Sequence, residues 1–248
     1  MNAARLLGLF AAATGVFMLT QVPLGLALPL LGFERAGFGA GAVQGSIWRG
    51  KIVGATWRDR SVGDVSVRFS AYSLAIGQLG FDLQTDRDAP FVLNGNVAWV
   101  PFRGVAVAGA RISAPADSLP IFFNMTGRID AEVTRLVVAT HGCLTSDATI
   151  AAQELSVQGL GGRWAVPGLK GSVKCDANDL VLDLAGRDAT QAVVATMTIR
   201  PAGSFSVKIT SVSSDPVIAA GLSAVGFVPG DGSKTDLVFA QEGRWSGS

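Results

Sequence analysis

The sequence predicts a mainly β protein in which an N-terminal transmembrane helix precedes a domain of antiparallel strands. Two observations point to this class. Residues 6–33 contain no charged side chain, and most of the remaining chain alternates apolar and polar residues in short runs bounded by Gly, Asp and Asn. Such period-two alternation is the pattern of strands with one buried and one wetter face. The 31 glycines among 248 residues supply the tight turns that such a chain needs.

Residues 6–33 are predicted to span a membrane. A hydrocarbon core about 30 Å thick requires roughly 20 apolar residues in a helix, and this run is longer. Because Arg5 lies before the run and no net charge follows it, residues 1–5 are expected in the cytoplasm and the rest across the bilayer. A cleaved signal peptide is an alternative, since Ala36 to Ala42 supplies small residues, and so is a buried helix of a soluble protein.

Residues 34–248 are expected to form consecutive antiparallel strands. In residues 62–71, for example, Val65 and Val67 fall on one face while Asp64 falls on the other. The same pattern fits a curved sheet, a sandwich or a half-barrel. The predicted strands are residues 46–48, 51–58, 62–71, 74–84, 91–100, 105–113, 128–139, 149–158, 171–175, 180–185, 192–200, 204–210 and 234–241.

Two short helices are predicted to interrupt the strands. The first covers residues 117–123 with Asp117 as its N-cap, and Pro120 allows it little more than one turn. The second begins at Asp215 with Pro216 in its first position, and Gly226 is placed as its C-cap.

The two helical interruptions resemble each other. Each combines an Asp, a nearby Pro, an apolar cluster, a Gly and then a strand, at an offset of about 100 residues. We therefore expect an internal duplication, with residues 34–139 as the first β-rich repeat and residues 140–248 as the second. A chance recurrence of strand–helix–strand order is the alternative.

Cys143 and Cys175 both lie in the predicted exported part, where two cysteines favour one disulfide. Closing a loop of that size stabilises a protein by roughly 3–4 kcal/mol in the chain-entropy model. A metal site would need more ligands than these two thiols, and His141 alone does not complete one. No metal and no cofactor are expected.

The sequence offers little for catalysis. His141 is the only histidine, and its neighbour Cys143 is better explained by the disulfide, so a nucleophile–base pair has no good candidate. The close carboxylates Asp86/Asp88 and Asp176/Asp179 fall in turns, where Asp normally caps backbone groups. A net charge of +1 without a basic stripe argues against nucleic acid. We predict a protein that is not an enzyme and has no small-molecule substrate.

The segment Gly45-Ser46-Ile47-Trp48-Arg49-Gly50 stands out just after the predicted anchor. Its two glycines allow a positive φ or a close backbone approach, so the Trp48 ring is expected to hold the start of the domain against the sheet. Trp48 and Arg49 together are also candidates for contact with a partner protein. Trp57 follows within the next predicted strand.

These landmarks resemble the N component of the type II (general) secretion pathway. The resemblance rests on the N-terminal anchor, the Gly45 to Gly50 element, Trp57 in Ala-Thr-Trp, and the later segment Gly171 to Cys175. It covers nearly the whole chain. It implies a single-pass inner-membrane protein of a Gram-negative bacterium, with a periplasmic β domain and no catalytic residues to carry over.

The resemblance implies a non-enzymatic part of the machine that moves folded proteins from the periplasm across the outer membrane. Its expected partners are the membrane and other inner-membrane or periplasmic subunits of that machine. The alternative is an envelope lipid-binding or lipid-transfer protein, because an antiparallel sheet can curl into an apolar groove. The inner face of the sheet separates the two: an open apolar trough favours lipid, and a filled core favours scaffolding.

Overall fold

The structure is a computed structural model, and it describes residues 14, 22–25, 38–57, 60–86, 88–100, 104–118, 125–159, 162–201, 203–230 and 236–244. Most of the predicted anchor at residues 6–33 lies outside these ranges, as do residues 119–123 of the first predicted helix. Within the described ranges, no helix combines the length and the apolar character needed to cross a membrane.

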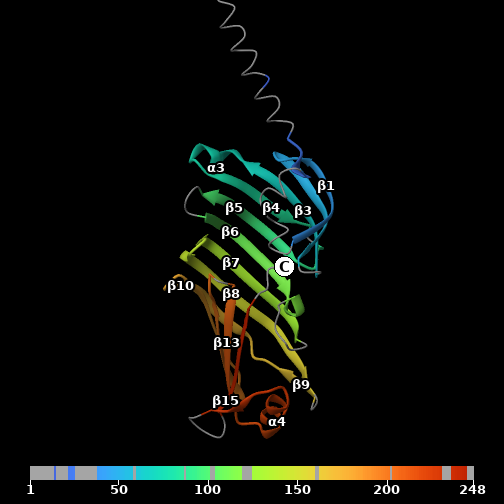
Figure 1. Cartoon of the computed structure of the whole chain (residues 1–248). Helices are drawn as coiled ribbons and strands as arrows, with labels where there is room; N and C mark the ends of the chain where they lie inside the picture. The colour runs from blue at the N-terminus through green and yellow to red at the C-terminus, as the bar shows by residue number, and fades with distance from the viewer. Residues whose placement is uncertain are drawn as a thin grey trace, which may run out of the picture.

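The described strands form one antiparallel sheet of 15 strands, which confirms the predicted fold class in its β part (Figure 1). From β1 to β8 each strand pairs with the next one along the chain, and the order continues from β10 to β13. Because all of these strands share one sheet, a two-sheet sandwich is excluded for the described residues. The strands are β1 (Phe38–Ser46), β2 (Arg49–Trp57), β3 (Arg60–Ser70), β4 (Leu79–Thr85), β5 (Val92–Val100), β6 (Gly104–Pro115), β7 (Met125–Ala139), β8 (Gly142–Gly159), β9 (Gly162–Ala165), β10 (Leu169–Asp176), β11 (Asp179–Arg187), β12 (Gln191–Ile199), β13 (Ser204–Ser213), β14 (Val228–Pro229) and β15 (Asp236–Arg244).

The sheet is strongly curved. Strands β5 to β8 run obliquely in Figure 1, whereas β13 and β15 stand almost upright, so the strand direction turns along the sheet. Register shifts in the β2–β3, β5–β6 and β7–β8 ladders are bulges, which bend the strand that carries them. Gly54 and Gly109 adopt φ values of 61° and 57° beside such shifts, a conformation that glycine adopts without a side-chain clash.

Alternate residues of the strands fill the core on one face of the sheet. In β3, Val65 and Val67 are buried together with Ala55 of β2, as the alternation predicts. A central cluster combines Ala110, Val133, Ala148 and Val173 from four different strands, and further clusters follow toward β13. The central cluster thus combines residues from both sides of residue 139.

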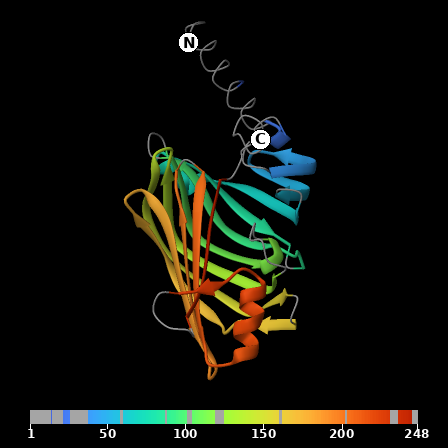
Figure 2. The same cartoon turned by 60° about the horizontal axis from the view of Figure 1, so that its bottom comes forward.

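Helix α4 (Pro216–Ala224) confirms the second predicted helix. The Asp215 side chain accepts a hydrogen bond from the Val217 N–H at 2.8 Å, and proline occupies the first turn. Gly226 follows the helix with φ 101°, and the Phe227 N–H donates to the Leu222 carbonyl at 3.1 Å. Figure 2 shows α4 near one end of the sheet, over its concave side. Leu222 is completely buried there.

The predicted strand at residues 74–84 is wrong in its first part. Residues Ala71–Ala75 form a short helix, α3, and strand β4 starts only at Leu79. The Gln78 N–H donates to the Ser73 carbonyl at 2.8 Å, and Gly77 turns the chain with φ 75°. A run of five residues is too short for apolar periodicity to separate helix from strand, which explains the error.

Two further predictions change in detail. Asp117 lies inside a 3₁₀ turn, η2 (Ala116–Ser118), instead of capping a helix from outside. The strand predicted at residues 46–48 is the end of a longer strand, β1, followed by a turn at Ile47 and Trp48. The alternating glycines and alanines at residues 39–42 have no apolar–polar alternation, so the pattern did not reveal the beginning of β1.

Candidate functional site

The segment Gly45 to Gly50 forms the tight turn between β1 and β2. Gly45 and Gly50 face each other in the ladder, and Gly45 has φ 82°. A Cβ atom at Gly50 would lie 2.5 Å from the Leu24 side chain and 2.9 Å from the Gln44 carbonyl oxygen. The close packing of Leu24 against the hairpin therefore requires glycine at position 50.

The Trp48 side chain packs against the sheet from this turn. Its ring meets the Phe69 ring edge-on with centroids 4.7 Å apart, and the Trp48 carbonyl accepts a hydrogen bond from the Phe69 N–H at 3.1 Å. Phe69 in turn packs against Phe81 with ring centroids 5.7 Å apart. The turn is thus attached to β3 and β4, while 37% of the Trp48 side-chain surface still faces solvent.

Arg49 and Trp57 occupy the two ends of β2 and are not brought together. Arg49 is exposed and lies opposite Arg68 in the β2–β3 ladder, which places two positive charges side by side on the outer face. Trp57 stacks on Phe38 with centroids 6.2 Å apart, so it closes the other end of the first hairpin. The two predicted site tryptophans are therefore packing groups at opposite ends of one strand pair.

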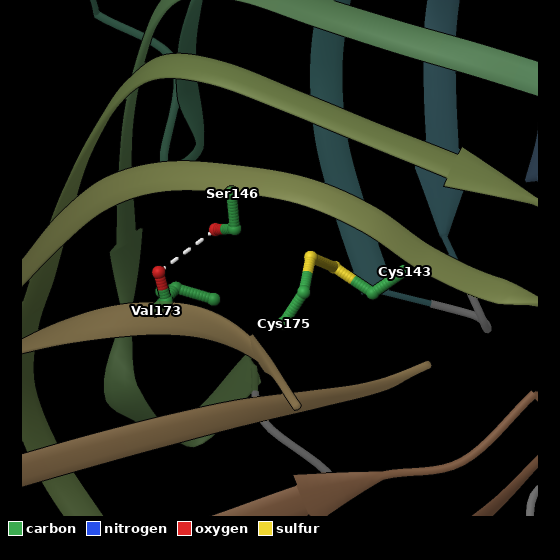
Figure 3. The surroundings of a disulfide bond; sticks show 4 residues. All are labelled: Cys143, Ser146, Val173 and Cys175. Atoms are coloured by element: carbon green, nitrogen blue, oxygen red, sulfur yellow. Dashed lines mark hydrogen bonds between the residues drawn. A yellow bond between two sulfur atoms is a disulfide. The ribbon is translucent and has the colours of Figure 1, made fainter. Parts of the chain in front are cut away.

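Cys143 and Cys175 form the predicted disulfide, with Cα atoms 5.3 Å apart (Figure 3). Cys143 lies at the beginning of β8 and Cys175 near the end of β10. The ladder between these strands is short, since β8 and β10 pair only from Ala148 to Ala152. The Ser146 hydroxyl donates to the Val173 carbonyl at 2.8 Å just beyond this ladder. The disulfide therefore joins the two strands beyond the end of their ladder.

His141 lies exposed in the turn between β7 and β8, next to the disulfide. Asp176 and Asp179 face each other across a two-residue turn, in which Ala177 and Asn178 have φ values of 47° and 76°. Positive φ at both central positions is the geometry of a tight hairpin turn, so these carboxylates belong to a turn. In the described part of the chain, no three His, Cys, Asp or Glu side chains gather as metal ligands would.

A cavity of about 220 Å³ lies on the core face of the second half of the sheet. Strands β7, β8 and β10 to β13 form its floor, and Trp164, Val225 and Phe227 lie among the residues that complete its wall. Nearly all lining side chains are apolar: Met125, Ile129, Ile150, Ala152, Leu155, Val157, Trp164, Val166, Leu169, Leu182, Leu184, Val193, Ala195, Thr196, Met197, Val207, Ile209, Val225 and Phe227.

A hydrogen-bond network holds the Trp164 wall in place. The Trp164 Nε1–H donates to the Gln191 Oε1 at 2.7 Å, and the Gln191 amide donates to the Ala165 carbonyl at 2.7 Å. The Trp164 ring then meets the Phe227 ring edge-on, with centroids 6.1 Å apart. Since Gln191 is buried, these bonds also satisfy its polar atoms.

Asp188 anchors this network. Its carboxylate accepts hydrogen bonds from the Thr190 N–H at 2.7 Å and from the Gln191 N–H and side-chain amide at 2.9 and 3.1 Å. Hydrogen bonds to the charged form, first of all the one from the Thr190 N–H, lower the pKa of Asp188 from 3.8 to about 2. Asp188 therefore stays ionised at any ordinary pH and holds Gln191 beneath Trp164.

The sequence left an apolar groove on the sheet as an alternative, but it did not predict which residues line the cavity or the network at Trp164. Trp164 and Gln191 are 27 residues apart and share no local pattern.

A family model described as type II secretion system (T2SS), protein N matches residues 36–235, well over half of the chain. The match covers the turn at Gly45 to Gly50, the disulfide, the cavity and helix α4. No curated protein and no solved structure matches the chain.

Proposed function

Because the chain belongs to the type II secretion system protein N family, we propose that it is a non-enzymatic inner-membrane component of that system, supporting transport of folded proteins from the periplasm across the outer membrane. The family match over residues 36–235 carries this proposal. Membership of the family indicates a component of the secretion machinery located in the cell envelope.

Two features of the chain support a single-pass protein with its β domain in the periplasm. The uncharged residues 6–33 are long enough to cross a bilayer, and Arg5 on their N-terminal side favours a cytoplasmic N-terminus. The disulfide between Cys143 and Cys175 fits an oxidising compartment such as the periplasm.

The first hairpin is the proposed contact region for other subunits of the system. Strand β1 is an edge strand of the described sheet, paired on its outer side only by the bridge between Pro23 and Ser46 at its end, and an extended partner segment can pair with the rest of such an edge. At the end of this strand, Trp48 and Arg49 form an exposed aromatic and positively charged corner. Aromatic and Arg side chains are enriched in protein interfaces.

A chromosomal deletion tests the secretion role. We expect the deletion to reduce the amount of secreted substrate protein in the medium, or at least the levels of partner subunits in the membrane. The wild-type chain should restore secretion, and so should His141→Ala, because the proposed role uses no catalytic residue. Normal secretion by the deletion strain, with the complex intact, would contradict the proposal.

Site-specific crosslinking tests the contact region. A photoreactive amino acid at Arg49 should crosslink to another secretion subunit in native membranes. The same residue at Thr134, which is exposed in the middle of β7, serves as the control and should give no such product. Equal crosslinking from both positions would show that the first hairpin is not the contact region.

The apolar cavity favours a second candidate function, an envelope protein that binds or transfers lipid. A scaffold needs only a filled core, whereas this cavity of about 220 Å³ lies among apolar side chains of seven sheet strands, β7 to β13. The two functions are compatible, because a secretion component anchored in a membrane can also hold a lipid.

A further inference from the structure

The cavity has the chemistry of a hydrocarbon site. Its two polar side chains are already engaged: the Thr196 hydroxyl donates to Asp183 at 3.0 Å, and the Trp164 Nε1–H donates to Gln191. A sugar, nucleotide or peptide entering the cavity would lose its hydrogen bonds to water and find none among these side chains. Burying an uncompensated polar group costs about 1–3 kcal/mol. The lining thus selects an apolar ligand.

The volume of the cavity corresponds to part of one hydrocarbon chain. An apolar cavity of about 150 Å³ accepts benzene, which has six carbons, so about 220 Å³ accepts about nine carbons. Met125 and Met197 line the cavity, and their flexible thioether side chains adapt to ligands of irregular shape.

An exposed apolar row lies on the same face of the sheet as the cavity, toward the other end of β7. Ile129 of β7 lines the cavity, whereas Val133 and Leu136, further along this face, pack in the central core cluster. Val138 lies on the same face of β7 and pairs in register with Val105 of β6. The register continues to Trp99 of β5 and Leu79 of β4. These four residues form the exposed row, and between 38% and 48% of the surface of each is exposed.

We propose that the cavity binds the end of one acyl chain of a membrane phospholipid. A phospholipid chain is longer than the roughly nine carbons that the cavity accepts, so the rest of the chain and the headgroup lie outside the cavity. The predicted anchor at residues 6–33 holds the domain beside a bilayer, which supplies phospholipid. The inference rests on the second candidate function and is independent of the secretion role.

Photolabelling of the full-length protein tests this inference. The protein is reconstituted in phosphatidylethanolamine vesicles with a small fraction of a phospholipid that carries a diazirine at the end of one chain. Irradiation and peptide mass spectrometry should locate adducts on cavity peptides, including those with Met125 and Met197. Free decanoate in excess should reduce these adducts at least tenfold. Adducts confined to residues 6–33 would overturn the inference.

A pair of neighbouring variants supplies the matched control. Ala195→Phe fills the cavity, and we expect at least a tenfold loss of cavity adducts. Val194→Phe adds the same ring on the opposite face of β12, where the side chain is 51% exposed, and should leave the adducts unchanged. Equal labelling of the two variants would overturn the inference, and so would cavity adducts in wild-type protein that decanoate does not displace. Neither readout depends on secretion, so a failure of the secretion role is separately visible.

Discussion

Asp188 shows how one carboxylate supports the wall of the cavity, and it leads to a prediction about pH. Its pKa is about 2 in the folded protein and 3.8 ordinarily, so the ionised form favours folding. This stabilisation is complete above the ordinary pKa and is lost as the pH falls from about 4 to about 2. Asp188→Asn keeps an acceptor oxygen but removes the charge.

We therefore expect wild-type protein to exceed Asp188→Asn in thermal unfolding midpoint by a constant amount above about pH 5, and this advantage to disappear as the pH approaches 2. Unfolding curves of both proteins across this range measure the difference. An advantage that persists unchanged at pH 2 would show that the charge of Asp188 does not carry the effect.

Ser211 gives a second prediction at the residue scale. Its side chain is completely buried on the core face of β13, and its Oγ is without a hydrogen-bond partner among the described residues. Ser211→Ala removes this uncompensated hydroxyl, so the free energy of unfolding should rise by about 1 kcal/mol. Ser213, two residues further, accepts a hydrogen bond from the Asp215 N–H at 3.1 Å, and Ser213→Ala should instead lower it by a similar amount.

Urea denaturation of the two variants measures both effects under the same conditions. The two variants can be compared directly because both serines are buried in β13 and face the same side of the sheet. Equal destabilisation by the two substitutions would contradict the prediction for Ser211.

Local rules explain which residues could be predicted from the sequence. Asp215 and Pro216 define the start of a helix through their own backbone geometry, so α4 was predicted with its N-cap. Its C-cap is Val225, and Gly226, which was predicted in that role, is the next residue. The disulfide was predicted because the chain has two cysteines and both lie in the part expected in an oxidising compartment. The bond between Trp164 and Gln191 depends on how β9 folds against β12, and no local pattern encodes it.

At the scale of elements, the disulfide supports the junction between β8 and β10, whose ladder extends only from Ala148 to Ala152 on β8. The chain between the cysteines spans 32 residues, so losing the bond should lower the free energy of unfolding by about 3–4 kcal/mol. Cys143→Ser combined with Cys175→Ser tests this by urea denaturation, with reduced wild-type protein as the control. Amide exchange should accelerate in β10 more than in β2. A loss below about 1 kcal/mol would contradict the entropic account.

The internal duplication stays a prediction. Helix α4 lies between β13 and β15, and η2 lies between β6 and β7, so both predicted helices join strands that pair with each other. However, α3 does the same between β3 and β4. Since three connections share this arrangement, strand–helix–strand order alone is not specific to a repeat of about 100 residues.

At the scale of the whole molecule, the sequence predicted consecutive antiparallel strands but left a curved sheet, a sandwich and a half-barrel open. The alternation of apolar and polar residues predicts which face of the sheet each side chain occupies. The curvature of the sheet depends instead on bulges such as those at Gly54 and Gly109. The residues that line the cavity could not be predicted either, because they come from seven sheet strands and from the chain after β9 and after α4. Each strand looks like an ordinary half-buried strand when taken alone.

The continuity of the sheet predicts how fragments behave. Strands β7 and β8 pair from Met125 to Ala139, across the predicted repeat boundary. We expect a fragment of residues 34–139 to remain largely unfolded, because β7 then loses β8, and a fragment of residues 34–159 to gain strand structure. Circular dichroism and amide exchange measure the difference. Equal structure in both fragments would show that the first repeat folds independently of β8.

The strand order also has a consequence for biosynthesis. From β1 to β8, each strand pairs with the one synthesised just before it. A chain that is delivered N-terminus first therefore presents these strands in the order of their pairing, and no strand in this half must wait for a distant segment of the chain. This order allows the sheet to grow in one direction, away from β1, with the newest strand as the edge to which the next one is added.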